Sequence, residues 1–204
     1  GYFLLGLFLA PFHRTWLIAV GVGGLSLIAY HLIRIAFRES CAYQYVLSVV
    51  LGVFTAQFIN QMHGMFEMHF FAFIGSALLI TYQNWKLQLP LLCFIVLHHS
   101  LFCYLQNAGL PHVYFSQLPY THWSSFTTHM LLTCLISFFS GLCAFQLHKY
   151  HQIQMVQTEQ MSRLQENAQL ADAMKEKNMI LESIGDAFFA LNKDWAVTYW
   201  NRTA

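Results

Sequence analysis

Apolar runs long enough to cross a lipid bilayer dominate residues 1–147 of this sequence. The hydrocarbon core of a membrane is about 30 Å thick, so a helix needs roughly 17 to 25 apolar residues to span it. A backbone surrounded by lipid must satisfy its hydrogen bonds within each segment, which favours helices. The runs therefore predict an all-α polytopic membrane protein, with spans over residues 16–33, 45–61, 66–82, 90–105 and 123–147.

A shorter apolar segment, residues 2–10, comes before these runs and is followed by Pro11. It is too short to cross a membrane, so we interpret it as the end of a first span whose beginning lies outside this sequence. A secretory signal peptide fits less well, because there is no basic start and no small-residue cleavage site before Pro11. The prediction is a bundle of six transmembrane helices, the first of them truncated.

Charge divides the chain into a membrane part and an aqueous part. Six charged side chains lie in residues 1–147 and thirteen lie in residues 148–204. Basic residues are retained on the cytoplasmic side of a membrane. They follow the second, fourth and sixth predicted spans, at Arg34, Arg38, Lys86 and Lys149. We therefore expect a cytoplasmic C-terminus, and the net charge of +1 argues against nucleic acid as a partner.

Histidines gather at the opposite, outer ends of the predicted spans, although they come from segments far apart in the sequence. The stretch Met62–His69 adds a carboxylate and several methionines to two of these histidines. Ionisable groups near membrane depth are costly and mark functional positions. Imidazole suits copper, zinc and iron, and a carboxylate suits zinc or iron. The sequence predicts a transition-metal site with candidate ligands His63, Glu67, His69, His98, His99 and His129.

One tight turn cannot surround an ion with all of its ligands. We therefore expect the residues of Met62–His69 to form one wall of the site and the histidines of the last two spans to form the other. The three methionines are interpreted as packing, although thioether ligands would favour Cu(I).

Other readings of the same residues remain open. Two imidazoles from facing helices could hold haem b, and a histidine–glutamate cluster could respond to periplasmic pH. Polar side chains also join membrane helices by hydrogen bonds, so a purely structural role is possible in principle. A membrane di-iron oxidoreductase would also gather histidines from several spans, but its HxxHH boxes are missing here and would face the cytoplasm.

The aqueous tail begins as a helix. No Gly or Pro interrupts residues 147–184, and a three-four spacing of apolar, small and polar residues predicts a weak parallel coiled coil within a homodimer. Two short strands follow, over residues 187–191 and 197–200, with a polar turn between them. We expect a transmembrane sensor domain in 1–147, a signalling helix in 148–182 and the start of an α/β domain in 183–204.

Two segments resemble parts of bacterial signalling proteins. The motifs "ILESIGDAFFAL", "DW" and "TYWN" near residue 200 are similar to the opening of PAS domains in sensor histidine kinases. The motifs "QMHGMFEMHFFAF" and "HHSLFCYLQ", between Gln61 and Phe115, resemble the membrane region of some methyl-accepting chemotaxis proteins and related sensors.

These resemblances imply an input region in the bacterial inner membrane that acts on a response regulator or another output domain. The shared positions in the membrane region are His63, Glu67, His69, His98 and His99. The sequence contains no ATP-binding or phosphoacceptor motif, so kinase activity is implied by resemblance alone.

Overall fold

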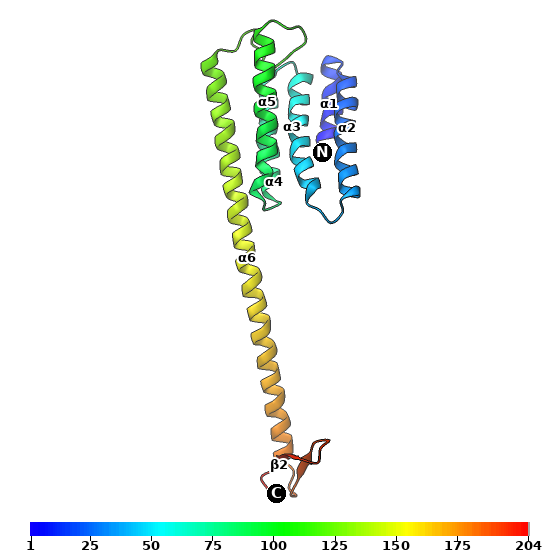
Figure 1. Ribbon diagram of the computed structural model, residues 1–204, viewed down its shortest axis with the longest axis vertical. Helices are drawn as coiled ribbons and strands as arrows, with labels where there is room; N and C mark the ends of the chain where they lie inside the picture. The colour runs from blue at the N-terminus through cyan, green and yellow to red at the C-terminus, as the bar shows by residue number, and fades with distance from the viewer. Residues whose placement is uncertain (204) are drawn as a thin grey trace. The chain divides into compact units, whose positions relative to one another are not determined.

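A computed structural model describes residues 1–203 of the chain. The described residues are mostly helical, and they divide into two compact units, Gly1–Lys149 and Tyr150–Ala204. The first unit is a bundle of antiparallel helices (Figure 1). Its elements are α1 (Tyr2–His13), α2 (Trp16–Ala36), α3 (Ala42–Gln61), η1 (Phe66–His69), α4 (Phe70–Ile80), η2 (Trp85–Leu87), α5 (Gln88–Asn107) and the first part of α6 (Trp123–Glu182).

Four helices are long and apolar enough to cross a membrane: α2, α3, the η2–α5 segment and α6. Large apolar side chains on their outer surfaces are exposed, and Leu17 in α2 is 90% accessible. Soluble proteins do not present apolar surface on this scale, so the chain is a membrane protein. The apolar helices Tyr2–His13 and Phe66–Ile80 are shorter, and the six-span count stays a prediction.

Pro11 does not end the first helix. The sequence predicts an end at Ala10, but α1 continues through Pro11 to His13. The helix stops at Arg14, which takes the left-handed conformation with φ 57° and closes the last turn as a C-terminal cap.

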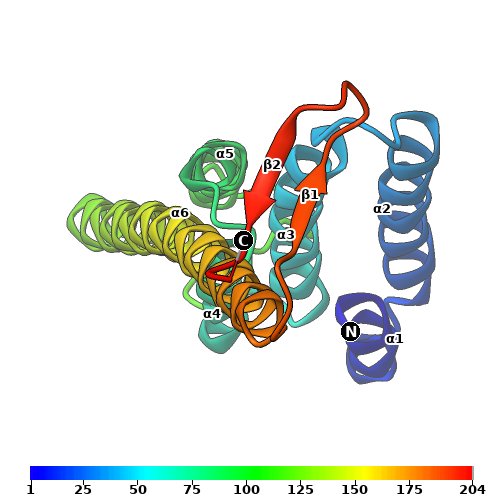
Figure 2. The same ribbon diagram turned by 90° about the horizontal axis from the view of Figure 1, so that it is seen from below.

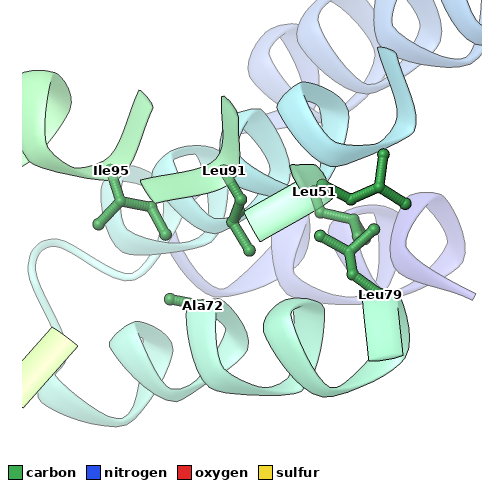
Figure 3. Close-up of a cluster of buried hydrophobic side chains, with 6 residues drawn as sticks. Leu51, Ala72, Leu79, Leu91 and Ile95 are labelled. Carbon is green, nitrogen blue, oxygen red and sulfur yellow. The ribbon is translucent and has the colours of Figure 1, made fainter. Parts of the chain in front are cut away.

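Helix α3 is the centre of the first unit, with α2 and α5 on opposite sides of it (Figure 2). The core joins α3, α4 and α5 through buried aliphatic side chains (Figure 3). Leu51 comes from α3, Ala72 and Leu79 from α4, and Leu91 and Ile95 from α5. Burying one such leucine stabilises a soluble fold by about 1.5–3 kcal/mol, whereas in lipid close packing takes over that role.

Buried amide side chains also join the helices. Gln88 of α5 donates to the backbone carbonyl of Ser76 in α4 at 3.0 Å and accepts from its hydroxyl at 2.7 Å. Gln61 of α3 donates to the carbonyl of Gly6 at 3.0 Å and to the hydroxyl of Thr15 at 3.1 Å. Such bonds stabilise membrane helix pairs by about 0.6 kcal/mol each on average.

The second unit contains the remainder of α6 and an antiparallel hairpin of β1 (Phe189–Leu191) and β2 (Val197–Trp200). Both expected strands are thus present, and β1 is two residues shorter than the predicted strand over residues 187–191. The Asn192 side chain forms the turn, because its Oδ1 accepts from the backbone N–H groups of Asp194 and Ala196, both at 2.9 Å. A PAS domain and a coiled-coil dimer stay predictions.

Candidate metal centre

Three histidines from three different elements lie together near the end of the bundle that holds the α3–α4 and α5–α6 connections. They are His69 at the end of η1, His99 in α5 and His129 in α6. One ring nitrogen from each lies within 4.8 Å of the others. The ring centroids are 5.2 Å apart for His69 and His99, 5.3 Å for His69 and His129, and 5.4 Å for His99 and His129.

These separations match three imidazoles around one ion. A metal about 2.0–2.1 Å from each nitrogen, in tetrahedral geometry, places the ring centroids about 5.2 Å apart. The His99 and His129 rings are nearly parallel, at 6°, and the His69 ring stands at 88° to both. The three residues are therefore placed to hold one ion.

Hydrogen bonds indicate which ring nitrogen each histidine can offer. Nδ1 of His69 lies 3.2 Å from the carbonyl oxygen of Phe66, which only accepts, so Nδ1 carries the proton. Nδ1 of His99 is paired with Nδ1 of His98 at 3.2 Å. Nε2 of His129 is buried and has no hydrogen-bond partner among the described residues. Nε2 is thus the available nitrogen of His69 and His99, whose other nitrogen is held by the protein as in many metal ligands, and Nε2 of His129 is available as well.

A glycine turn brings His69 to this position. Gly64, between α3 and η1, has φ 78°, and its N–H donates to the carbonyl of Ile59 at 2.8 Å. A Cβ on Gly64 would lie 2.5 Å from the carbonyl carbon of Ser116. The α5–α6 connection, residues 108–122, therefore packs directly on the turn, which leaves room only for glycine.

The same connection covers the histidines with an aromatic ring. Phe115 is buried, and its centroid lies 5.5 Å from His69 and 5.3 Å from His99. On its other side it meets Phe126 of α6 at 6.0 Å. Phe115 thus shields the three-histidine group from the end of the bundle.

Two amides at the end of α5 hold the connection in place. Oε1 of Gln106 accepts from the backbone N–H groups of Phe115 and Ser116, at 2.5 and 3.1 Å. Oδ1 of Asn107 accepts from the N–H of Thr121 at 2.9 Å, and its Nδ2 donates to the Thr121 carbonyl at 3.0 Å. The cover is therefore attached to α5 by side-chain to backbone bonds, which fix a loop that has no regular structure of its own.

His98, a predicted ligand, lies behind His99 rather than in the group of three. It is buried, and its ring packs on Phe102 at a centroid distance of 4.2 Å. Its hydrogen-bond contact is with Nδ1 of His99, a candidate ligand. This position suits a residue that orients a ligand.

His63 and Glu67 also lie outside the group. His63 has φ 50° and stacks between His13, at 3.9 Å, and Tyr114, at 4.2 Å. Burial, followed by the nearby His13 and His112, lowers the pKa of His63 from its usual value. Glu67 is exposed in the first turn of η1, where the helix end favours an anion.

Sequence reasoning did not identify Phe115 or Tyr114 as part of this region. The connection around Phe115 has no helical or strand periodicity, so no pattern indicated which of its side chains turns inward. No spacing in the sequence predicted the contact between His13 and His63.

Comparison with known proteins gave no match: no family model, curated protein or solved structure corresponds to this chain.

Proposed function

We propose that this chain is the membrane-embedded sensory input region of a bacterial signal-transduction protein, and that a transition metal ion held by His69, His99 and His129 is its detector. The observation that carries the proposal is the convergence of three imidazoles from three elements at the spacing that one ion requires. The resemblance to chemotaxis receptors and sensor histidine kinases supplies the signalling context.

The ligand set favours copper, zinc or iron. All three donors are neutral imidazoles, which suit these metals. The methionines that would favour Cu(I) face elsewhere, because Met62 and Met68 pack against the apolar cluster around Phe54 and Phe58. Three protein ligands leave a tetrahedral ion with one open position, a pattern typical of reactive rather than structural sites.

The geometry favours an ion over haem. Two imidazoles that bind one haem iron lie on opposite faces of the porphyrin, with their centroids about 6 Å apart and the macrocycle between them. Here three rings lie at 5.2–5.4 Å from one another, and a third ring would stand where the porphyrin must pass.

Metal binding would change how α6 packs. Within the bundle α6 buries few side chains, namely Phe126, Thr133, Ser137 and Ala144. An ion bound through His129 would link this helix to η1 and α5. Because the ion needs all three ligands at once, it binds the docked position of α6 more tightly than any other, and that difference in affinity is what a signal requires.

The last helix offers a route for the signal. It is continuous from Trp123 to Glu182, so a shift or rotation near His129 can be carried along its axis. In a homodimer the weak coiled coil would repack at low cost and pass the change to the PAS domain that the C-terminal hairpin is proposed to begin.

The test uses the full chain in detergent or nanodiscs, titrated with Co²⁺, whose visible absorption reports coordination number. We expect one ion per chain, with binding lost in His129→Ala. His122→Ala is the matched control, because His122 lies just ahead of the same helix and is exposed.

A second measurement addresses signalling. Spin labels at the exposed positions Leu97 and Leu131, in a cysteine-free background, should report a metal-dependent distance between α5 and α6 that His129→Ala abolishes. Failure to bind a stoichiometric ion contradicts the metal site. Binding without any movement of α6 contradicts the sensory role.

A further inference from the structure

A cavity of about 140 Å³ opens beside the three-histidine group. Two of its walls are the rings of His69 and His129. Phe66, Phe115, Leu118 and Phe126 supply the apolar part of the remaining lining, and Ser116, Thr121 and Ser125 supply hydroxyl groups. The cavity is therefore apolar except where it meets the candidate ligands and a few hydroxyl groups.

The cavity has a way in. A wider groove on α6 shares Phe66, Ser125 and His129 with it and continues past Thr128 and Leu132. A molecule that follows this groove reaches the histidines between η1 and α6. His99 does not line either space, so the approach to an ion lies on the side of His69 and His129.

An ion at this site has a coordination position to fill. Three imidazoles supply three of the four ligands of a tetrahedral ion. Nε2 of His129, buried and without a hydrogen-bond partner among the described residues, belongs to a ring that lines the cavity. A molecule in the cavity can therefore bind the same ion as this nitrogen.

We propose that the cavity binds a small uncharged molecule, of the size and polarity of dioxygen or carbon monoxide, as the fourth ligand of the ion. This inference rests on the proposed metal site and names what that site detects. The volume corresponds to about four or five water molecules at about 30 Å³ each, so a diatomic molecule fits. Apolar walls disfavour a charged ligand, because they offer no compensation for its lost hydration.

Ser125 gives the cavity its polar contact. It lies one helical turn before His129, on the same face of α6, and lines both the cavity and the groove. The hydroxyls of Ser116 and Thr121, by contrast, already bond to each other at 3.1 Å. Ser125 is thus placed to donate to the outer atom of a bound diatomic molecule.

The test uses the full chain loaded with Cu(I) and exposed to carbon monoxide, whose stretching band in the infrared reports binding to copper. We expect a band in the wild type. Ser125→Phe should fill the cavity and weaken carbon monoxide binding by at least about tenfold at unchanged copper content. Thr127→Phe is the matched control, because Thr127 is exposed on the same turn of α6 and lines neither space.

Ser125→Ala should keep the carbon monoxide but shift the band, since the hydroxyl contact is lost. Stoichiometric copper with no band, or a band that Ser125→Phe leaves unchanged, overturns the ligand pocket and leaves the metal site standing. A wild type that binds Co²⁺ but no stoichiometric copper overturns the ligand pocket alone, and a wild type that binds neither overturns the metal site as well. Copper content, measured in each variant together with its size-exclusion profile, separates the two failures from misfolding.

Discussion

The Nδ1 atoms of His98 and His99 lie 3.2 Å apart, so one of the two rings donates a hydrogen bond to the other. If His99 binds a metal through Nε2, its Nδ1 carries the proton and is the donor, and His98 is the acceptor. Neighbouring residues of a helix point about 100° apart. Here the His98 ring therefore lies outside the three-histidine group but still reaches Nδ1 of His99.

This pairing predicts a role for His98 in metal affinity. His98→Ala should weaken Co²⁺ binding by about 10- to 100-fold, because His99 loses the partner that fixes its tautomer and ring orientation. His98→Gln, which keeps an acceptor, should recover part of the affinity. Competition titrations against a chelator measure the effect, with the exposed His31→Ala as control. Wild-type affinity in His98→Ala would show that the pair is mere packing.

The Gly64 turn predicts a stability effect with a matched control. Gly64→Ala should destabilise the chain by more than about 1 kcal/mol, because a Cβ at φ 78° is strained and would overlap the Ser116 backbone. Gly109→Ala is strained in the same way, at φ 79°, but meets no atom within 4 Å. Thermal unfolding in detergent should therefore rank Gly64→Ala well below Gly109→Ala. Equal losses would mean that contact with the α5–α6 connection contributes nothing.

The His13–His63–Tyr114 stack predicts acid sensitivity. The lowered pKa of His63 means that the folded state favours its neutral ring, so the unfolded chain binds more protons just below the ordinary value of about 6.5. Its contribution to stability is therefore present above that pH and is lost as the pH falls toward the lowered pKa.

We expect the melting temperature to fall less between about pH 7.5 and 5.5 in His63→Asn than in the wild type. Asparagine is chosen because it tolerates the φ of 50°. His148→Asn, at an exposed position of α6, should leave the pH dependence unchanged. If all three proteins lose stability equally on acidification, His63 is not the sensitive group.

Asn201 predicts the strength of the helix–hairpin junction in the second unit. It is buried, accepts from the N–H of Phe188 at 2.8 Å and donates to the carbonyls of Ile184 and Asp186 at 3.1 and 2.8 Å. Asn201→Ala removes all three bonds and leaves the N–H of Phe188 without its partner, whereas the two carbonyls keep only the longer bonds from the Thr203 hydroxyl, at 3.3 and 3.4 Å. Amide exchange at Phe188 should then rise by about tenfold or more, whereas Lys193→Ala in the exposed turn should not change it. An unchanged exchange rate at Phe188 in Asn201→Ala would mean that other contacts stabilise the junction.

The sequence predicted this architecture to the extent that one-dimensional patterns encode it. Apolar length placed the major helices to within a few residues, and alternation with turn residues placed the hairpin, because both signals are local. The choice among the predicted ligands was not local. His69, His99 and His129 meet because the bundle brings η1, α5 and α6 together at one depth, and no spacing along the chain encodes that depth.

The departures from prediction have physical causes of the same kind. His63 lies close in sequence to His69, but the left-handed turn directs it toward His13 instead of the interior. His98 differs from His99 by one residue and by about 100° of helical rotation. His99 therefore points toward His69 and His129, and His98 does not. Phe115 reaches the histidines from a loop that is shaped by the amides of α5.

The cover formed by the α5–α6 connection contributes no candidate metal ligand, and its anchors, Gln106 and Asn107, bond mainly to its backbone, with one longer bond from Gln106 to the Ser116 hydroxyl at 3.5 Å. Side chains of the cover other than Phe115 and Ser116 can therefore change without removing the anchors or a candidate ligand. Affinity for the ion and access to it are encoded in separate parts of the chain. Substitutions in one loop could then retune which molecules are admitted, so that a single helical scaffold serves detectors of different selectivity.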